Sequence, residues 1–218
     1  MKTIEDFVLV KQDASIEKLT AGGLVIPNVG TIPMAYGTIE EIGPGRYNAW
    51  KDKVVPVDDL KVGDYVVYNP GPGVDLPTTN KNSTKLKKLN AMEFMLVLDR
   101  DEDGKMVGVK YVRENYLIVK RETGDKKTLG GIYVPEFGVD GKLVSGTVVM
   151  QGPGKYNAGT DSRVPVCTKI GDKVVYVDIK AIELNLPTKN DKGEIVKEKF
   201  YMIPDSAVEV ILDEDENV

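Results

Sequence analysis

The residue types that most often carry out catalysis are scarce in this chain of 218 residues. It has no histidine and a single cysteine, Cys167. The lack of histidine excludes Ser-His-Asp and Cys-His nucleophiles, the H-E-x-x-H zinc site and a histidine-based pH switch. One cysteine can form neither an intramolecular disulfide nor a cysteine-rich metal site, and this usage favours a reducing compartment. The sequence therefore points away from these hydrolase and metalloenzyme classes.

Two glycine-rich segments, GPGRYNA at 43–49 and GPGKYNA at 152–158, could suggest a loop that binds phosphate. They lack the third glycine of G-x-G-x-x-G and the Gly-Lys-Ser/Thr of a P-loop. We interpret both as turns, with Trp50 after the first turn packed at the rim of the domain. Two acidic pairs that could bind a metal are interpreted as solvated charges of turns and linkers: Asp58 with Asp59, and Asp99 with Asp101.

Two apolar triplets inside polar segments are the strongest candidates for a binding site. Each follows a Gly-Gly pair and precedes a proline. Either each triplet is the core of a hairpin arm, or it is the hydrophobic anchor of a mobile loop that binds a partner's groove. Burying each aliphatic side chain gains roughly 1.5–3 kcal/mol, which the ordering of the loop largely offsets, so several loops must act together. The candidate residues are Gly22, Gly23, Leu24, Val25, Ile26, Gly130, Gly131, Ile132, Tyr133 and Val134.

The elements that carry these triplets occur twice in the chain. GTIEEIGPGRYNA at 37–49 recurs 109 residues later as GTVVMQGPGKYNA, with 8 of 13 positions identical. KVGDYVVY at 61–68 recurs as KIGDKVVY at 169–176, with 6 of 8 identical. Matching blocks in one order at nearly one period indicate a tandem duplication, and the period suits a whole small domain.

Short apolar or alternating runs separated by Gly, Pro and Asn predict a mostly β protein of small barrels or sandwiches. The charged segment 100–108 is interpreted as a linker or a reversing turn, which places one domain at 1–99 and the other at 109–218. The formal net charge of −5 disfavours nucleic-acid binding as the main function. No run of about 18 apolar residues is present, so no membrane span is expected.

The ordered set of motifs resembles the GroES-like co-chaperonins, over nearly all of both repeats. The set consists of an apolar strand with Val-Lys, a polar segment, Gly-Gly with a triplet, a Gly-Thr strand, a Gly-Pro-Gly turn and Lys-x-Gly-Asp. The tandem layout is similar to the two-domain co-chaperonins of plastids. The resemblance implies two tandem GroES-like small β-barrels, each with a mobile loop and a roof hairpin. Tyr133 departs from the usual aliphatic middle residue of the triplet.

The resemblance also implies a function. The chain would form an oligomeric lid, a ring or dome, on a large GroEL-like chaperonin ring and assist folding by capping its cavity. The two triplets would bind the chaperonin's apical grooves. The partner would bind and hydrolyse ATP, so the chain itself would be no enzyme and would need no cofactor. The lack of a transit peptide at Met1 favours the cytoplasm of a bacterium or of a phage-infected host over the plastid stroma.

Two other interpretations remain open from the sequence. A tandem β-barrel interaction or virion structural protein could keep the fold and lose chaperonin binding. A remnant reductase barrel is disfavoured because no dinucleotide-binding domain follows. The duplication also poses a question of symmetry, because the partner in the co-chaperonin family is seven-fold and two barrels per chain do not divide seven. Mixed rings with a single-domain co-chaperonin or a chaperonin of different symmetry would resolve it.

Overall fold

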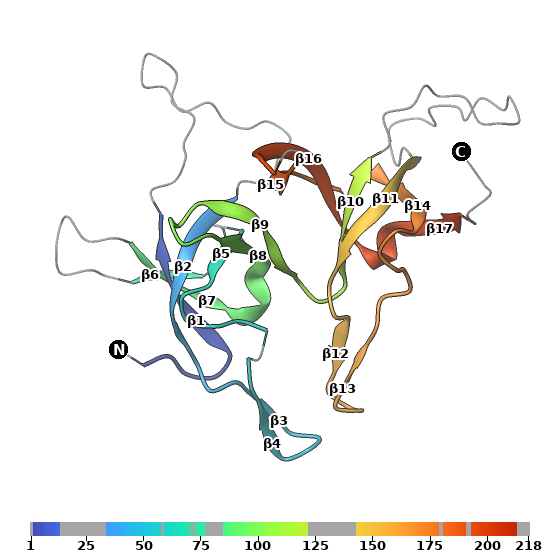
Figure 1. Ribbon diagram of the computed structural model, residues 1–218. Coiled ribbons are helices and arrows are strands. Elements are labelled where there is room, and N and C mark those ends of the chain that lie inside the picture. The colour runs from blue at the N-terminus through green and yellow to red at the C-terminus, as the bar shows by residue number, and fades with distance from the viewer. Residues whose placement is uncertain are drawn as a thin grey trace, which may run out of the picture. The chain divides into compact units, whose positions relative to one another are not determined.

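The chain forms two compact β-rich units (Figure 1). The computed structural model describes residues 2–13, 34–57, 59–69, 71, 73–76, 85–121, 143–178, 181–190 and 193–212. The first unit comprises Met1–Tyr111 with Ala158–Asp161, and the second Val112–Asn157 with Ser162–Val218. No α-helix occurs among the described residues. The prediction of an all-β protein is thus confirmed, while closure of each sheet into a barrel stays a prediction.

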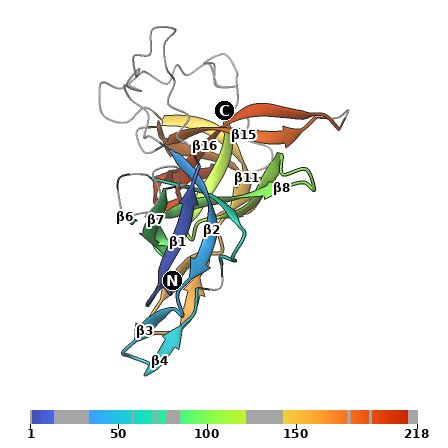
Figure 2. The same ribbon diagram turned by 90° about the vertical axis from the view of Figure 1, so that its left-hand side faces the viewer.

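The first unit is built on a seven-stranded sheet in the order β6-β7-β1-β2-β5-β8-β9, with β3 and β4 paired as a separate hairpin. Figure 2 looks onto this unit, with β1 beside β2. Its elements are β1 (Phe7–Gln12), β2 (Ala35–Ile42), β3 (Arg46–Asn48), β4 (Lys53–Val55), β5 (Tyr65–Tyr68), β6 (Val74–Leu76), β7 (Leu86–Asn90), the 3-10 turn η1 (Ala91–Glu93), β8 (Phe94–Arg100) and β9 (Met106–Val112).

The second unit has a six-stranded sheet in the order β15-β16-β10-β11-β14-β17, and β12 and β13 form its separate hairpin. Its elements are β10 (Tyr116–Arg121), β11 (Leu143–Gln151), β12 (Lys155–Asn157), β13 (Ser162–Val164), β14 (Lys173–Val177), β15 (Ile182–Lys189), β16 (Ile195–Pro204), the 3-10 turn η3 (Asp205–Ala207) and β17 (Val208–Leu212).

The two sheets repeat one topology, as the duplicated sequence predicts. β10 takes the place of β1 between its neighbours, and β17 takes that of β8. Even the irregularities recur: the β1–β2 register shifts between Leu9 and Val10, and the β10–β11 register shifts between Ile118 and Val119. A β-bulge is a feature that related folds preserve. The repeat unit is therefore a whole sheet, and the first unit adds β9.

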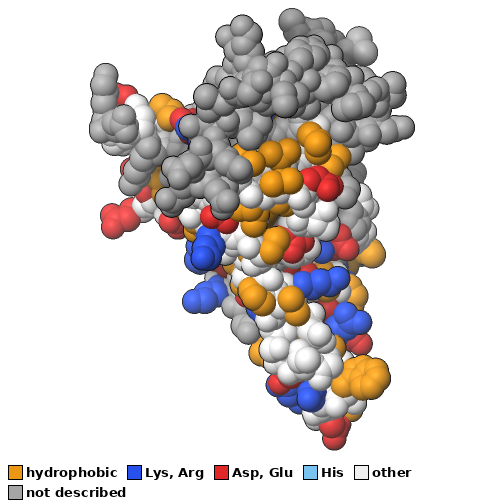
Figure 3. Space-filling model, turned by 90° about the vertical axis from the view of Figure 1, so that its right-hand side faces the viewer, with side chains coloured by type: hydrophobic (Ala, Val, Ile, Leu, Met, Phe, Trp, Pro, Cys, Tyr) orange, Lys and Arg blue, Asp and Glu red, His pale blue; other side chains and the backbone are white. Residues whose placement is uncertain are grey.

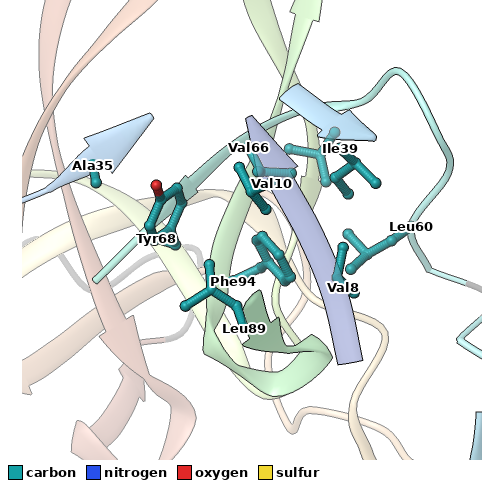
Figure 4. Packing of buried hydrophobic residues seen from close by; sticks show 10 residues of the cluster. Val8, Val10, Ala35, Ile39, Leu60, Val66, Tyr68, Leu89 and Phe94 are labelled. Carbon is teal, nitrogen blue, oxygen red and sulfur yellow. The ribbon is translucent and has the colours of Figure 1, made fainter. Parts of the chain in front are cut away.

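The core of the first unit lies on one face of β1 (Figure 4). Val8 and Val10 alternate along the strand and are fully buried, as period-two patterning requires of one sheet face. They pack in one cluster with Ile39 of β2 and Tyr68 of β5. Phe94 meets Tyr68 edge-on, with ring centroids 6.1 Å apart, a geometry that aromatic pairs favour.

The second unit repeats this core with equivalent residues. Leu117 and Val119 of β10 are fully buried and pack with Val148, Val174 and Tyr176. At about 25 cal/mol per Å² of apolar surface, such side chains supply most of the folding free energy of a small domain. Each unit therefore has its own hydrophobic cluster around its central strand.

The Gly-Pro-Gly segments are turns, as predicted. The Gly43 and Gly45 N–H groups donate to the carbonyls of Phe7 and Glu5, at 2.8 and 2.9 Å. Gly45 has a φ of +118°, and a Cβ on it would lie 2.1 Å from the carbonyl oxygen of Val55. Only glycine fits this close approach without strain. The Gly43 amide group is thus bonded to β1, and the Gly45 amide group is bonded to a residue just before β1, so neither is free to bind a phosphate.

The charged segment between the repeats belongs to the first sheet. Arg100 ends β8, β9 begins at Met106, and the Asp101 N–H donates to the carbonyl of Lys105 at 2.9 Å. The segment is therefore the turn of a hairpin and parts of its two strands. The expectation that Trp50 packs at the rim of the domain is wrong, because its side chain is 82% exposed. It lies in the turn of the β3–β4 hairpin, beyond the reach of the core.

Candidate binding site

The ten predicted binding residues lie outside the described residues, within 14–33 and 122–142. Their structural environment can be described only where these segments leave the sheets. The first segment connects β1 to β2, and the second connects β10 to β11. Each therefore joins two antiparallel, hydrogen-bonded strands. We call the residue clusters at these strand ends the first root (Asp13, Tyr36, Tyr65 and Arg100) and the second root (Arg121, Tyr176, Asp178 and Tyr201).

The first root fixes the end of β1 by polar and aromatic contacts. The Asp13 N–H donates to the carbonyl of Tyr36 at 3.0 Å, and the Tyr65 hydroxyl donates to Asp13 Oδ2 at 2.6 Å. The rings of Tyr36 and Tyr65 stack with centroids 6.3 Å apart. The Arg100 guanidinium lies 3.4 Å from the Tyr65 ring centroid, within the range of a cation–π contact. Four strands thus meet at this point.

The electrostatics of the first root keep Tyr65 protonated. Burial raises its pKa, and the hydrogen bond to the Asp13 carboxylate raises it further, to about 12. Arg100 opposes this shift by favouring the phenolate. A neutral hydroxyl that donates to a carboxylate is a charge-assisted hydrogen bond, which is stronger than a neutral one. The contact therefore ties β1 to β5 at the last described residue before the first segment.

The second root uses a different set of side chains. Arg121, the last residue of β10, donates to Asp178 Oδ1 through Nη2 and to the Tyr176 hydroxyl through Nε at 3.4 Å. Its guanidinium also lies 3.9 Å from the ring centroid of Tyr201 on β16. Burial raises the pKa of the Tyr176 hydroxyl. Arginine presents donors and a planar face at once, so it can join three partners. The root links β10 to β14 and β16.

The two roots are not equivalent in sequence. At the period of 109 residues, Arg121 corresponds to Gln12, and Asp13 corresponds to Glu122. Sequence reasoning missed both clusters, because Tyr65 is 52 residues from Asp13 and Asp178 is 57 residues from Arg121. The signal that could have found them is a charged or aromatic residue at each strand end that flanks the Gly-Gly segments.

The roots consist of tyrosine, arginine and aspartate side chains that contact one another at the strand ends. No group of three or more Asp, Glu, Cys or His side chains that could bind a metal occurs in the described part of the chain. Cys167 is exposed and has no disulfide partner. Within the described ranges, no helix is long and apolar enough to cross a membrane. What the arrangement offers is a set of contacts that tie the ends of β1 and β10 to neighbouring strands.

Comparisons with known proteins agree with the repeat. The family described as "Chaperonin 10 Kd subunit" matches residues 1–92 and again residues 111–208. The co-chaperonin GroES of Mycolicibacterium vanbaalenii is 32% identical over 101 residues, which cover 46% of this chain and 88% of that protein. The co-chaperonin GroES of Mycobacterium tuberculosis matches with the same identity and coverage. The chain therefore belongs to the chaperonin 10 kDa subunit family, in a form that carries the family's domain twice.

Proposed function

We propose that this protein is a co-chaperonin that caps an ATP-driven chaperonin ring and so assists protein folding. The observation that carries the proposal is the double family match, since each matched range contains one complete Gly-Gly-triplet segment. The residues proposed to bind the chaperonin are the ten named in the sequence: Gly22, Gly23, Leu24, Val25, Ile26, Gly130, Gly131, Ile132, Tyr133 and Val134.

The binding energy of such a lid comes from many weak contacts. Each triplet gains a few kcal/mol from burial and loses much of it when its segment is ordered. Several triplets on one assembly raise the effective concentration of each, so the assembly binds far more tightly than one segment. The chain therefore acts as part of a ring or dome. The partner supplies ATP binding and hydrolysis, and the proposal needs no cofactor in this chain and places it in the cytoplasm.

The roots support this function by tying down the ends of each binding segment. A segment whose two ends are fixed loses less freedom on binding than a free tail, because the ends are already close together. The Tyr65–Asp13 bond and the Arg121 contacts supply this restraint in the two units. The chain would thus present each triplet from a rigid sheet.

Serine substitutions in the triplets test the proposal. The variants are Leu24→Ser with Ile26→Ser, Ile132→Ser with Val134→Ser, and all four together. With a GroEL-type chaperonin and ATP, we expect each pair to weaken the complex and the fourfold variant to abolish it, with unchanged circular dichroism. Val62→Ser is the matched control, because Val62 is exposed and lies outside both segments. A fourfold variant that binds like the wild type would refute the proposed function.

A further inference from the structure

The β3–β4 hairpin of the first unit exposes large apolar side chains. β3 and β4 pair with each other in a sheet of two strands, separate from the seven-stranded sheet. Tyr47 and Val54 lie directly opposite each other, so their side chains share one face of the hairpin. Their exposed fractions are 59% and 51%, and Trp50 in the turn between them is exposed further still. Large apolar side chains that gather on one exposed element are candidates for an interaction surface.

The second unit builds the same hairpin without most of these apolar side chains. In β12–β13, Arg163 takes the place of Val54, opposite an equivalent tyrosine. At the same period, Gly159 takes the place of Trp50. Both hairpins have strands of three residues and follow a Gly-Pro-Gly turn. The hairpin fold therefore requires neither Trp50 nor Val54, and these side chains are available to bind a partner.

Basic side chains flank the apolar ones. Arg46 precedes Tyr47 and Lys51 follows Trp50 in the chain, and both basic side chains are exposed. The single acidic residue of the hairpin, Asp52, accepts a hydrogen bond from the Tyr47 hydroxyl at 2.6 Å. At the lower end of Figure 3, the level at which Figure 1 draws the hairpins, hydrophobic side chains and basic side chains both reach the surface. The hairpin is thus a locally positive element of a chain whose formal net charge is −5.

This combination of side chains fits the surface of a lipid bilayer that carries negative charge. Tryptophan and tyrosine favour the interface between water and lipid, because their rings are largely apolar and carry one polar group. Lysine and arginine near the bilayer are attracted to anionic headgroups. A single-stranded nucleic acid would instead stack its bases on aromatic and guanidinium groups. The aliphatic Val54, on the same face as Tyr47, adds apolar burial and so favours lipid over a nucleic acid.

We propose that the β3–β4 hairpin docks on an anionic lipid bilayer. Tyr47, Trp50 and Val54 enter the interface between water and lipid. Arg46 and Lys51 face the negatively charged headgroups. The binding is peripheral and reversible, because a few apolar side chains anchor a protein only together with a second attraction, here that of the positive charges. The β12–β13 hairpin has no tryptophan and takes no part.

The fluorescence of Trp50 tests the docking directly, because it is the only tryptophan of the chain. The full-length protein is mixed, without any chaperonin, with vesicles of phosphatidylcholine and phosphatidylglycerol or of phosphatidylcholine alone. We expect the emission to shift to shorter wavelength, and to be protected from acrylamide quenching, with the anionic vesicles only. High salt should reverse the shift, since it screens the attraction between exposed charges.

Three results of this titration would overturn the proposal. The first is an emission that anionic vesicles leave unchanged. The second is an equal shift with both kinds of vesicle, which would exclude recognition of charge. The third is a shift that appears with a single-stranded oligonucleotide or an unfolded polypeptide and not with vesicles, which would assign the hairpin to that partner instead.

Vesicle sedimentation tests the residues of the hairpin. Trp50→Gly introduces the residue that the second hairpin has at this place, so the hairpin should still form, as circular dichroism can verify. It should weaken binding to anionic vesicles by roughly tenfold or more, since burial of one large apolar side chain changes an equilibrium by at least this factor. Arg46→Gln with Lys51→Gln should remove the preference for anionic over neutral vesicles.

Ile170→Ser is the matched control for these variants, because Ile170 is exposed and lies in the second unit. We expect it to bind anionic vesicles like the wild type. A Trp50→Gly variant that binds anionic vesicles as tightly as the wild type would overturn the proposal, because another surface would then hold the lipid. No chaperonin is present in these experiments, so each result leaves the proposed chaperonin binding separately testable.

Discussion

At the scale of single residues, glycines and tyrosines set the local geometry of each repeat. Gly45 and Gly154 both adopt positive φ, and a Cβ on either would lie 2.1 Å from a strand carbonyl oxygen. The sequence motif predicted these turns correctly, because glycine and proline are the residues that tight turns between two strands favour. The motif did not predict that each turn would close against the residues just before the first strand of its repeat, since that contact joins distant parts of the chain.

Replacing Gly45 with alanine should destabilise the fold. The new Cβ would clash with the Val55 carbonyl, and a non-glycine residue at this φ is strained, together at a cost of roughly 1–3 kcal/mol. Urea unfolding followed by circular dichroism measures the change. Gly108→Ala serves as the control, because nothing lies within 4 Å of the position that its Cβ would take. A Gly45→Ala variant as stable as the wild type would show that the turn relaxes freely.

The Tyr65–Asp13 contact should make stability fall at high pH. The folded pKa of Tyr65 is about 12 and the unfolded value is 10.0, so the folded state holds this proton more tightly. The resulting stabilisation is complete below about pH 10 and is lost as the pH rises towards 12. Urea unfolding at pH 9 to 11.5 should show a steeper loss for the wild type than for Tyr65→Phe. Parallel curves would mean that this hydroxyl titrates normally in the folded protein.

At the scale of elements, most strands could be predicted from the sequence, whereas the contacts between strands could not. The apolar runs FVLV and YVVY became the central strands β1 and β5, in which Val8 to Val10 and Tyr65 to Tyr68 are all buried, and β-branched and aromatic side chains of this kind favour strands. β9 was not predicted as a strand, since its sequence MVGVKYV begins inside a segment read as a charged linker. β9 forms a strand because it pairs with β8. The sequence of a short segment does not predict which strand it will pair with.

Truncating a side chain of a central strand should affect stability far more than truncating an exposed one. Leu117 of β10 is fully buried within the second core. Leu117→Ala should lower the unfolding free energy by about 2–5 kcal/mol through lost burial and a residual cavity. Ile170→Ala, in an exposed turn of the same unit, should change it by less than about 0.5 kcal/mol. Equal effects in urea unfolding would contradict the core described here.

At the scale of the whole molecule, the duplication was the most informative feature of the sequence. It predicted the repetition of a unit, and the two sheets share one strand order. It could not predict the two roots, because Arg121 and Asp13 are not equivalent positions and their partners lie on other strands. The two segments that we propose to bind the chaperonin therefore begin at strand ends that are held by different contacts.

Native mass spectrometry of the protein mixed with a GroEL-type chaperonin, with and without ATP, tests the proposed function most directly. We predict a complex that forms only with nucleotide and whose mass equals the chaperonin plus several copies of this chain. The mass also determines how many two-domain chains make one lid. An assembly that ignores the chaperonin under both conditions would contradict the co-chaperonin function proposed here.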